Sequence, residues 1–321
     1  MNKPIYHKYL PRISDGLKSG KSLNQIGREL ASENGWTEGS GMGMVKRWAK
    51  RLDKQGPVIL QNVTRETWSD EIPNGEEAEL TSKKLNGVRK LAVLSDIHLP
   101  YHDKEALVAA IKWIKEFSPG TILLNGDILD FYPINRFSVN QRKPDLKYEF
   151  DTWRTFAAVL RAQFKNVNIY FKQGNHELRL RSYINKHAAA LDGVIDFDTL
   201  MDFRKYGFIH IADNKFIEVG KLKICHGHEV YSGAGAVNVA KVVFERTMDN
   251  ILCGHFHRTQ EFTKKAIGGE IRGGWVNGCL QQLTVDYMPV NQWNHGFACI
   301  EFEKDGTFAM HNKKIINGRV L

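Results

Sequence analysis

Aspartate, asparagine and histidine side chains follow five short apolar runs of this sequence, each at the point where the run ends. The runs are LAVLS, TILLN, VNIYFK, KLKIC and NILC. The side chains that follow them are Asp96, His98, Asp127, Asn175, His226, His255 and His257. Oxygen and imidazole donors without thiolates suit divalent transition metals. The set predicts a site for two divalent ions, with a carboxylate able to bridge them and open positions for water and substrate.

The five runs alternate with segments of helical periodicity. Leu107, Ile111 and Ile114 share one face of a predicted helix at 104–117, and a second helix is predicted at 151–164. Short apolar runs between amphipathic helices are typical of an α/β domain whose strands are buried on both faces. Open α/β sheets place their sites at the carboxyl ends of the strands. We therefore expect the seven side chains to meet at one edge of the domain.

The motifs DIH, GD, GNHE, HGH and GHFH occur in this order across residues 91–257. Together they resemble the motifs of the calcineurin-like metallophosphoesterases. The resemblance implies a two-sheet α/β/β/α sandwich of the metallophosphoesterase type over the C-terminal two-thirds of the chain. In such a sandwich, the segments 275–280 and 294–302 are expected to be further strands that close the second sheet.

The resemblance also implies which of the seven side chains bind which ion. One ion is bound by Asp96, His98 and His257. The second ion is bound by Asn175, His226 and His255, and Asp127 bridges the two. The implied cofactor is a pair of divalent ions, for which we expect Mn²⁺, with Fe, Zn, Ni and Mg as alternatives.

The implied reaction is in-line hydrolysis of a phosphoester by a hydroxide that bridges the two ions. His176 matches the family's proton donor to the leaving oxygen. No nucleophilic serine or cysteine stands in the motifs, so no covalent intermediate is required. Arg136 is either a bidentate phosphate ligand or an ordinary surface arginine. His228 is either a substrate contact or a neighbour of the site, and we leave it outside the metal ligands.

The basic character of the chain is concentrated at its N-terminus. Residues 1–55 contain 11 Lys and Arg against 5 Asp and Glu, a net +6 of the total +9. Helices are predicted at 20–31, with Ser22 as N-cap, and at 44–52. The pair resembles a helix-turn-helix DNA-binding domain, although the connection SENGWTEGSGM is longer than the usual three or four residues. The basic second helix either binds DNA phosphates or is a solvated face.

The composition divides the chain into three parts. We predict a small all-helical basic module at 1–55, a linker at 56–88 and the catalytic domain at 89–321. The acidic stretch ETWSDEIPNGEEAEL, with its Pro and Gly, favours the linker assignment.

No apolar run has the length of a membrane span, and the start lacks a signal-peptide pattern, so we expect a cytoplasmic protein with no membrane partner. The four cysteines are expected to be reduced and buried. The pattern does not indicate an oligomeric state.

Three classes of function compete. The basic module favours a phosphodiesterase acting on nucleic acid, with DNA as the predicted partner and single-stranded or gapped DNA preferred over duplex. The GNHE motif also occurs in phosphatase branches of the family, which supports a phosphomonoesterase for phosphoproteins or small molecules. The third class is a DNA-binding or scaffold protein with an inactive catalytic domain, which the complete ligand set disfavours.

Overall fold

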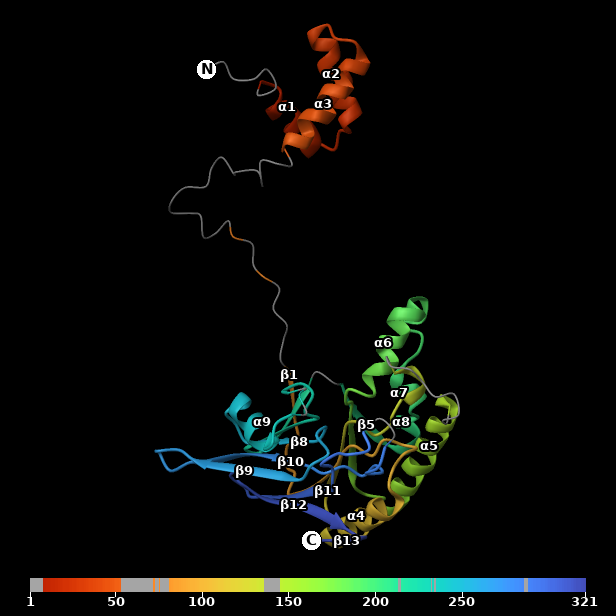
Figure 1. The fold of residues 1–321 in the computed structure, drawn as a ribbon, viewed down its shortest axis with the longest axis vertical. Coiled ribbons are helices and arrows are strands. Elements are labelled where there is room, and N and C mark those ends of the chain that lie inside the picture. Colours follow the sequence, from red (N-terminus) through yellow and green to blue (C-terminus); the bar gives the residue numbers. More distant parts are fainter. Residues whose placement is uncertain are drawn as a thin grey trace. The chain divides into compact units, whose positions relative to one another are not determined.

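The computed structural model describes residues 8–52, 72, 75, 81–135, 145–212, 215–231, 233, 235–285 and 288–321, without the side chains of residues 51 and 52. The chain separates into two compact units, Met1–Glu77 and Ala78–Leu321 (Figure 1). Most of the predicted linker, residues 56–71, 73, 74 and 76–80, lies outside the described residues.

The N-terminal unit is a bundle of three described helices. They are α1 (Leu10–Lys18), α2 (Leu23–Asn34) and α3 (Glu38–Leu52). The predicted cap of α2 is confirmed, because Gln25 N donates to Ser22 Oγ at 3.3 Å and Ser22 N donates to Gln25 Oε1 at 2.8 Å. The unit has its own apolar core, made of Tyr9, Leu10, Ile13, Ile26, Leu30, Val45 and Trp48.

The connection between α2 and α3 is only three residues long, so the long connection inferred from the sequence is wrong. Gly35, in the left-handed conformation with φ of 66°, ends α2. Helix α3 begins at Glu38 rather than at 44 and includes the glycine-rich segment. A Cβ on Gly41 would lie 2.4 Å from Gly27 O, so only glycine permits this close crossing. Tertiary packing thus overrides the low helix propensity of glycine.

The unit Ala78–Leu321, which contains the predicted catalytic domain and is called the catalytic unit below, has two mixed sheets. In the order of their pairing, the first sheet comprises β13 (Arg319–Val320), β12 (Phe308–Ile316), β11 (His295–Phe302), β2 (Lys90–Leu94), β3 (Thr121–Asn125), β4 (Asn168–Lys172) and β5 (Phe208–Ile211). The second sheet comprises β1 (Thr81–Lys84), β6 (Lys215–Val219), β7 (Leu222–Cys225), β8 (Ile251–Cys253), β10 (Ile271–Val276) and β9 (Gln260–Lys265). All five predicted apolar runs are therefore strands, three in the first sheet and two in the second.

Helices cover the outer faces of both sheets (Figure 1). The first sheet packs against α4 (Lys104–Phe117) and α5 (Leu146–Gln163), and the second against α9 (Val239–Thr247). Asp103 caps α4 by accepting from Ala106 N at 2.8 Å. The remaining helices are η2 (Tyr132–Ile134), α6 (Leu178–His187), η3 (Ala189–Leu191), α7 (Phe197–Leu200) and α8 (Phe203–Tyr206). This arrangement confirms the α/β/β/α sandwich with a helical N-terminal domain.

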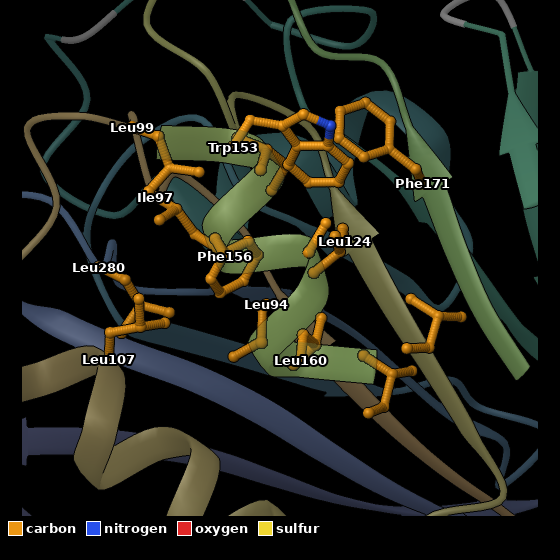
Figure 2. Close-up of a cluster of buried hydrophobic side chains, with 14 of the residues drawn as sticks. Leu94, Ile97, Leu99, Leu107, Leu124, Trp153, Phe156, Leu160, Phe171 and Leu280 are labelled. Carbon is orange, nitrogen blue, oxygen red and sulfur yellow. The ribbon is translucent and has the colours of Figure 1, made fainter. Parts of the chain in front are cut away.

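Apolar side chains fill the spaces between the layers. Figure 2 shows the cluster between the first sheet and its helices, where Trp153 and Phe171 meet edge to face at 5.4 Å. A second cluster lies between the sheets and includes Leu91, Leu123 and Ile224.

The four cysteines are free and buried, as predicted. None of the described helices combines the length and the apolarity that crossing a bilayer requires.

Two predictions about strands need correction. Residues 81–84, assigned to the linker, form β1 and pair with β6, so the catalytic unit begins before residue 89. The strand predicted at 294–302 is β11, but it pairs antiparallel with β2 and so extends the first sheet instead of closing the second. Sheet membership depends on long-range pairing, which the local pattern of a strand does not encode.

Candidate metal centre

The seven predicted side chains all lie in the loops that leave β2, β3, β4, β7 and β8 at their carboxyl ends. Five of them have left-handed backbone conformations, with φ between 50° and 66°. These are Asp96, His98, Asp127, His255 and His257. This conformation costs a non-glycine residue about 1–3 kcal/mol and clusters at functional sites. The sharp turns point the side chains toward one another across the ends of both sheets.

The side chains form compact groups with the spacing of metal ligands. One group is Asp96, His98 and His257, and another is Asp127, His226 and His255. Within these groups, His257 Nε2 lies 3.1 Å from Asp96 Oδ1, and His226 Nε2 lies 3.2 Å from Asp127 Oδ2. The first group reproduces the ligand set predicted for one ion. The second contains the bridging aspartate and two ligands of the other ion.

Asp127 also belongs to a third group, with His98 and His176. Its Oδ2 lies 3.9 Å from His98 Nε2 and 3.8 Å from His176 Nε2. Asp127 is therefore adjacent to ligands of both predicted ions, as a bridging carboxylate must be. In this third group, His176 lies close enough to Asp127 and His98 to bind a metal ion together with them. The sequence did not predict this arrangement.

Two buried polar atoms of the site fit a cation. Asn175 Oδ1 and His226 Nε2 are buried and have no hydrogen-bond partner among the described residues. The other ring nitrogen of His226, Nδ1, lies 2.8 Å from the carbonyl oxygen of Asn125. The Nδ1–H group therefore donates to this carbonyl, which leaves the lone pair of Nε2 facing the site. Because unsatisfied buried polar atoms are rare, a bound cation is the physical reason to retain them.

Other ligands are oriented in the same way. His98 Nδ1 lies 3.0 Å from Asp130 Oδ2, and His257 Nδ1 lies 2.9 Å from the side-chain amide of Gln281. Contacts of this kind fix the ring orientation and direct Nε2 at the metal. The backbone N–H of His255 donates to Asp96 Oδ2 at 2.9 Å. The sequence analysis assigned no role to Gln281, which lies in a loop far from the motifs.

The electrostatics of the site also favour a cation. Burial alone would raise the pKa of Asp127, but the surrounding imidazoles, His176 and His226 foremost, hold it well below its usual range. Burial opposes protonation of His226, yet the carboxylates of Asp127 and Asp96 raise its pKa to about 10. The site therefore attracts positive charge at Nε2 of His226. A metal ion satisfies the same attraction without the proton.

Three buried or largely buried glutamates hold the loops that carry the ligands. Glu177 accepts backbone N–H groups from Asp127, Ile128, Leu129 and Gly174 at 2.8–3.1 Å. Glu149 of α5 accepts from Phe131 N at 2.7 Å and Tyr132 N at 3.1 Å. Glu229 accepts from Gly227 N at 2.7 Å. The motifs GNHE and HGHE both end in glutamate, so the sequence carried a signal for two of these residues.

Glu229 also forms an ion pair with Lys172, the last residue of β4. Lys172 Nζ lies 2.6 Å from Glu229 Oε1, and the lysine side chain is fully buried. Although burial raises the pKa of Glu229, the charge of Lys172 contributes most to lowering it to about 2. The pair joins the end of the first sheet to the loop that carries His226. The sequence did not indicate this ion pair, because Lys172 is only the last residue of the apolar run VNIYFK.

His176, which precedes α6, is in contact with Arg179 in the first turn of that helix. Arg179 Nη2 lies 2.8 Å from His176 Nε2, and His176 Nδ1 lies 2.8 Å from Asp130 O. Burial, together with the charges of His98 and Arg179, lowers the pKa of His176 to about 4. The imidazole is thus neutral here and accepts from Arg179 through Nε2. Its predicted role as proton donor requires Arg179 to release that nitrogen.

The two predicted substrate contacts have different outcomes. His228 lies next to the site, with ring-centroid distances of 5.5 Å to His226 and 6.2 Å to His255. Its Nδ1 lies 3.3 Å from Glu229 Oε2, and it belongs to none of the ligand groups. Arg136 lies outside the described residues. Arg179, which the sequence analysis did not select, is the described arginine in contact with His176.

The chain is similar in sequence to two phage proteins, and its structure resembles several solved structures. The Gene 54 protein of Mycobacterium phage D29 is 27% identical over 180 residues, which cover 53% of this chain and 69% of that protein. The Gene 54 protein of Mycobacterium phage L5 is 26% identical over 231 residues, covering 66% and 88%. The match to the structure of vacuolar protein sorting 29 from Cryptosporidium parvum covers 73% of this chain and 95% of that one, with 14% identity and a TM-score of 0.39.

The family comparison is more specific. The model of the calcineurin-like phosphoesterase family matches residues 89–259, just over half of the chain. The match spans all five strands whose loops carry the ligand groups, from β2 to β8. The chain therefore belongs to the calcineurin-like phosphoesterase family and is a metal-dependent phosphoester hydrolase.

Proposed function

We propose that this protein is a manganese-dependent phosphodiesterase that cleaves DNA. The observation that carries the phosphoester chemistry is the convergence of two ligand groups around Asp127, which lies next to both. The first ion would be held by Asp96, His98 and His257, and the second by Asn175, His226 and His255, with Asp127 shared. When bound, the ions would acidify water and offset the charge of a phosphate.

The chain's own residues provide the rest of the chemistry. Once a substrate phosphate has drawn Arg179 away, its negative charge would favour uptake of a solvent proton at His176 Nε2, and this proton would pass to the leaving oxygen. A covalent route through a thiolate is disfavoured, since burial raises the pKa of both Cys279 and Cys299. The Cys225 thiol is also buried, and its contact with Cys253 raises its pKa well above the ordinary value. The raised pKa values of these buried thiols agree with direct hydrolysis, which needs no thiolate.

A basic face in the N-terminal unit supports a nucleic-acid substrate. Lys46, Arg47 and Lys50 of α3 are exposed, while Val45 and Trp48 of the same helix are buried in the core of the unit. The three-residue connection before α3 is of the length found in helix-turn-helix motifs. In such motifs the second helix enters the major groove and basic side chains contact phosphates. We therefore propose DNA as the partner of this face.

Two chromogenic substrates test the proposed reaction. We expect faster hydrolysis of bis(p-nitrophenyl) phosphate, a diester, than of p-nitrophenyl phosphate, a monoester. Activity should be lost in chelator and restored best by Mn²⁺, because manganese suits mixed imidazole and carboxylate ligands. Cleavage of single-stranded and gapped DNA should follow the same metal dependence. A preference for the monoester would instead support the phosphomonoesterase alternative.

A further inference from the structure

A cavity of about 600 Å³ opens beside the metal centre and extends along α6. It begins at Asn175, a predicted metal ligand, and reaches His187 at the end of the helix. Pro133 and Ile134 of η2 form part of its opposite wall. Its volume lies in the range of pockets that bind organic ligands. Neither the ligand groups nor the apolar core accounts for this cavity.

The packing of α6 does not require the side chains that line the cavity. Ile184 is buried and Leu180 packs against the main core, so these residues attach the helix to the domain. Arg179, Tyr183 and Lys186 follow one another at spacings of four and three residues, which places them on one face toward the cavity. Arg179 also contacts Asp130 and His176, but Tyr183 and Lys186 belong to no apolar core that the described residues form.

The lining of the cavity has the chemistry of a site for an extended anion with flat apolar groups. Arg179 and Lys186 are basic, and no described residue that lines the cavity is acidic. Tyr183 is 43% exposed, and its ring lies 4.7 Å from that of His187. Arg179 and Lys186 are seven residues apart, about 10 Å along the helix. Grooves for single-stranded nucleic acids combine positive charge with aromatic stacking platforms in this way.

We propose that the cavity along α6 binds the single-stranded DNA next to the phosphate that is cleaved, an inference that rests on the proposed nuclease function. Arg179 and Lys186 contact successive phosphates, and a base stacks on Tyr183. A base is available for stacking only where it is unpaired, so the groove favours single-stranded or gapped DNA over duplex. The N-terminal basic face contributes separately and plays no part in this preference.

The test uses the full-length protein and a fluorescently labelled oligothymidylate. Tyr183→Ala should weaken binding about tenfold, the usual size of one lost base stack, and Tyr183→Phe should retain it because the ring remains. Lys186→Ala should lower the slope of log affinity against log salt by about 0.7, as expected for one phosphate contact. Affinity is measured with Ca²⁺ in place of Mn²⁺, and cleavage rates are measured with Mn²⁺.

Matched controls exclude general effects of charge and stability. Arg181→Ala removes a positive charge from an exposed position of α6 that does not line the cavity, and Tyr148→Ala removes an exposed tyrosine from α5. Both should bind oligothymidylate like the wild type. For Tyr183→Ala and Lys186→Ala, the loss of kcat/KM on oligothymidylate should exceed by at least tenfold any loss on bis(p-nitrophenyl) phosphate, which is too small to occupy the groove.

The outcomes separate this inference from the proposed function. If the wild type hydrolyses neither bis(p-nitrophenyl) phosphate nor oligothymidylate, the proposed function fails, while the binding measurement still tests the groove. If DNA is cleaved but Tyr183→Ala and Lys186→Ala behave like Arg181→Ala and Tyr148→Ala, the groove is not a strand-binding site. If the two variants impair hydrolysis of a phosphopeptide and leave oligothymidylate binding unchanged, the cavity serves phosphoprotein and the inference is overturned.

Discussion

Arg179 and His176 share the carbonyl oxygen of Asp130. Arg179 Nη1 donates to this oxygen at 2.9 Å, and His176 Nδ1 lies 2.8 Å from it. The same guanidinium reaches His176 Nε2 through Nη2. Both nitrogens of the imidazole are therefore engaged, and Arg179 controls the one that faces the site. A phosphate that binds Arg179 would free His176 Nε2 at the moment when a substrate is present.

Replacement of Arg179 by lysine should reduce kcat/KM for bis(p-nitrophenyl) phosphate by about ten- to a hundredfold. An ammonium group cannot present the planar fork that contacts Asp130 and His176 together, and a lost charged hydrogen bond costs about 1.5–3 kcal/mol. Steady-state kinetics measure the effect, with Arg181→Ala as the control on the same helix. Wild-type rates in Arg179→Lys would show that charge alone is needed and that the forked contact is incidental.

Replacement of His176 by alanine should leave both metal ions bound and slow turnover by about a hundredfold or more, the size of a general-acid contribution. The loss should be smaller for p-nitrophenyl esters, whose leaving group hardly needs a proton, than for DNA. Metal content and single-turnover rates are measured on the same sample. Because His176 also forms a group with His98 and Asp127, loss of one ion would identify it as a ligand instead.

Asp127→Asn should lower manganese content and activity more than replacement of any other predicted ligand. Asp127 is the carboxylate common to two of the ligand groups, so the substitution removes charge next to both ions. We expect two ions per wild-type chain after saturation with manganese and dialysis, measured by elemental analysis. Activity should fall by more than about a hundredfold, the upper range for loss of residues that only orient ligands. Asp192→Asn, at an exposed position, is the control. One ion or none in the wild type would contradict the two-metal interpretation.

Glu229→Gln should destabilise the catalytic unit by about 3–5 kcal/mol, because it removes the negative charge that compensates the fully buried ammonium of Lys172. Urea unfolding in the presence of chelator measures the effect without a contribution from bound metal. The double variant Lys172→Met with Glu229→Gln removes the buried charge and should recover much of the loss. If the double variant is no more stable than Glu229→Gln alone, the ion pair does not explain the destabilisation.

Simultaneous replacement of Lys46, Arg47 and Lys50 by alanine should weaken DNA binding and reduce its dependence on salt. If all three contact phosphates, the slope of log affinity against log salt falls by about 2.7 on duplex DNA. Hydrolysis of bis(p-nitrophenyl) phosphate takes place in the other unit and serves as the internal reference. Lys18→Ala, at an exposed position of α1, controls for net charge. Equal salt slopes in the triple variant and the wild type would exclude α3 as a DNA contact.

The sequence alone determined the five strands that carry the site and the polar residues that follow them. Asp96, Asp127 and Asn175 could be selected because short apolar runs end abruptly in polar side chains, a pattern that needs no long-range information. The cap at Ser22 could be predicted for the same reason, since capping depends on neighbours three residues away.

Only the tertiary structure decided which groups meet. The pairing of β11 with β2, the joining of Lys172 to Glu229 and the contact of Arg179 with Asp130 all connect segments that are distant in the sequence. Helix α3 likewise begins early because Gly41 packs closely on Gly27, against the local preference of glycine. Local patterns specify periodicity and turns, whereas packing across the chain specifies partners, and the partners determine how the site works.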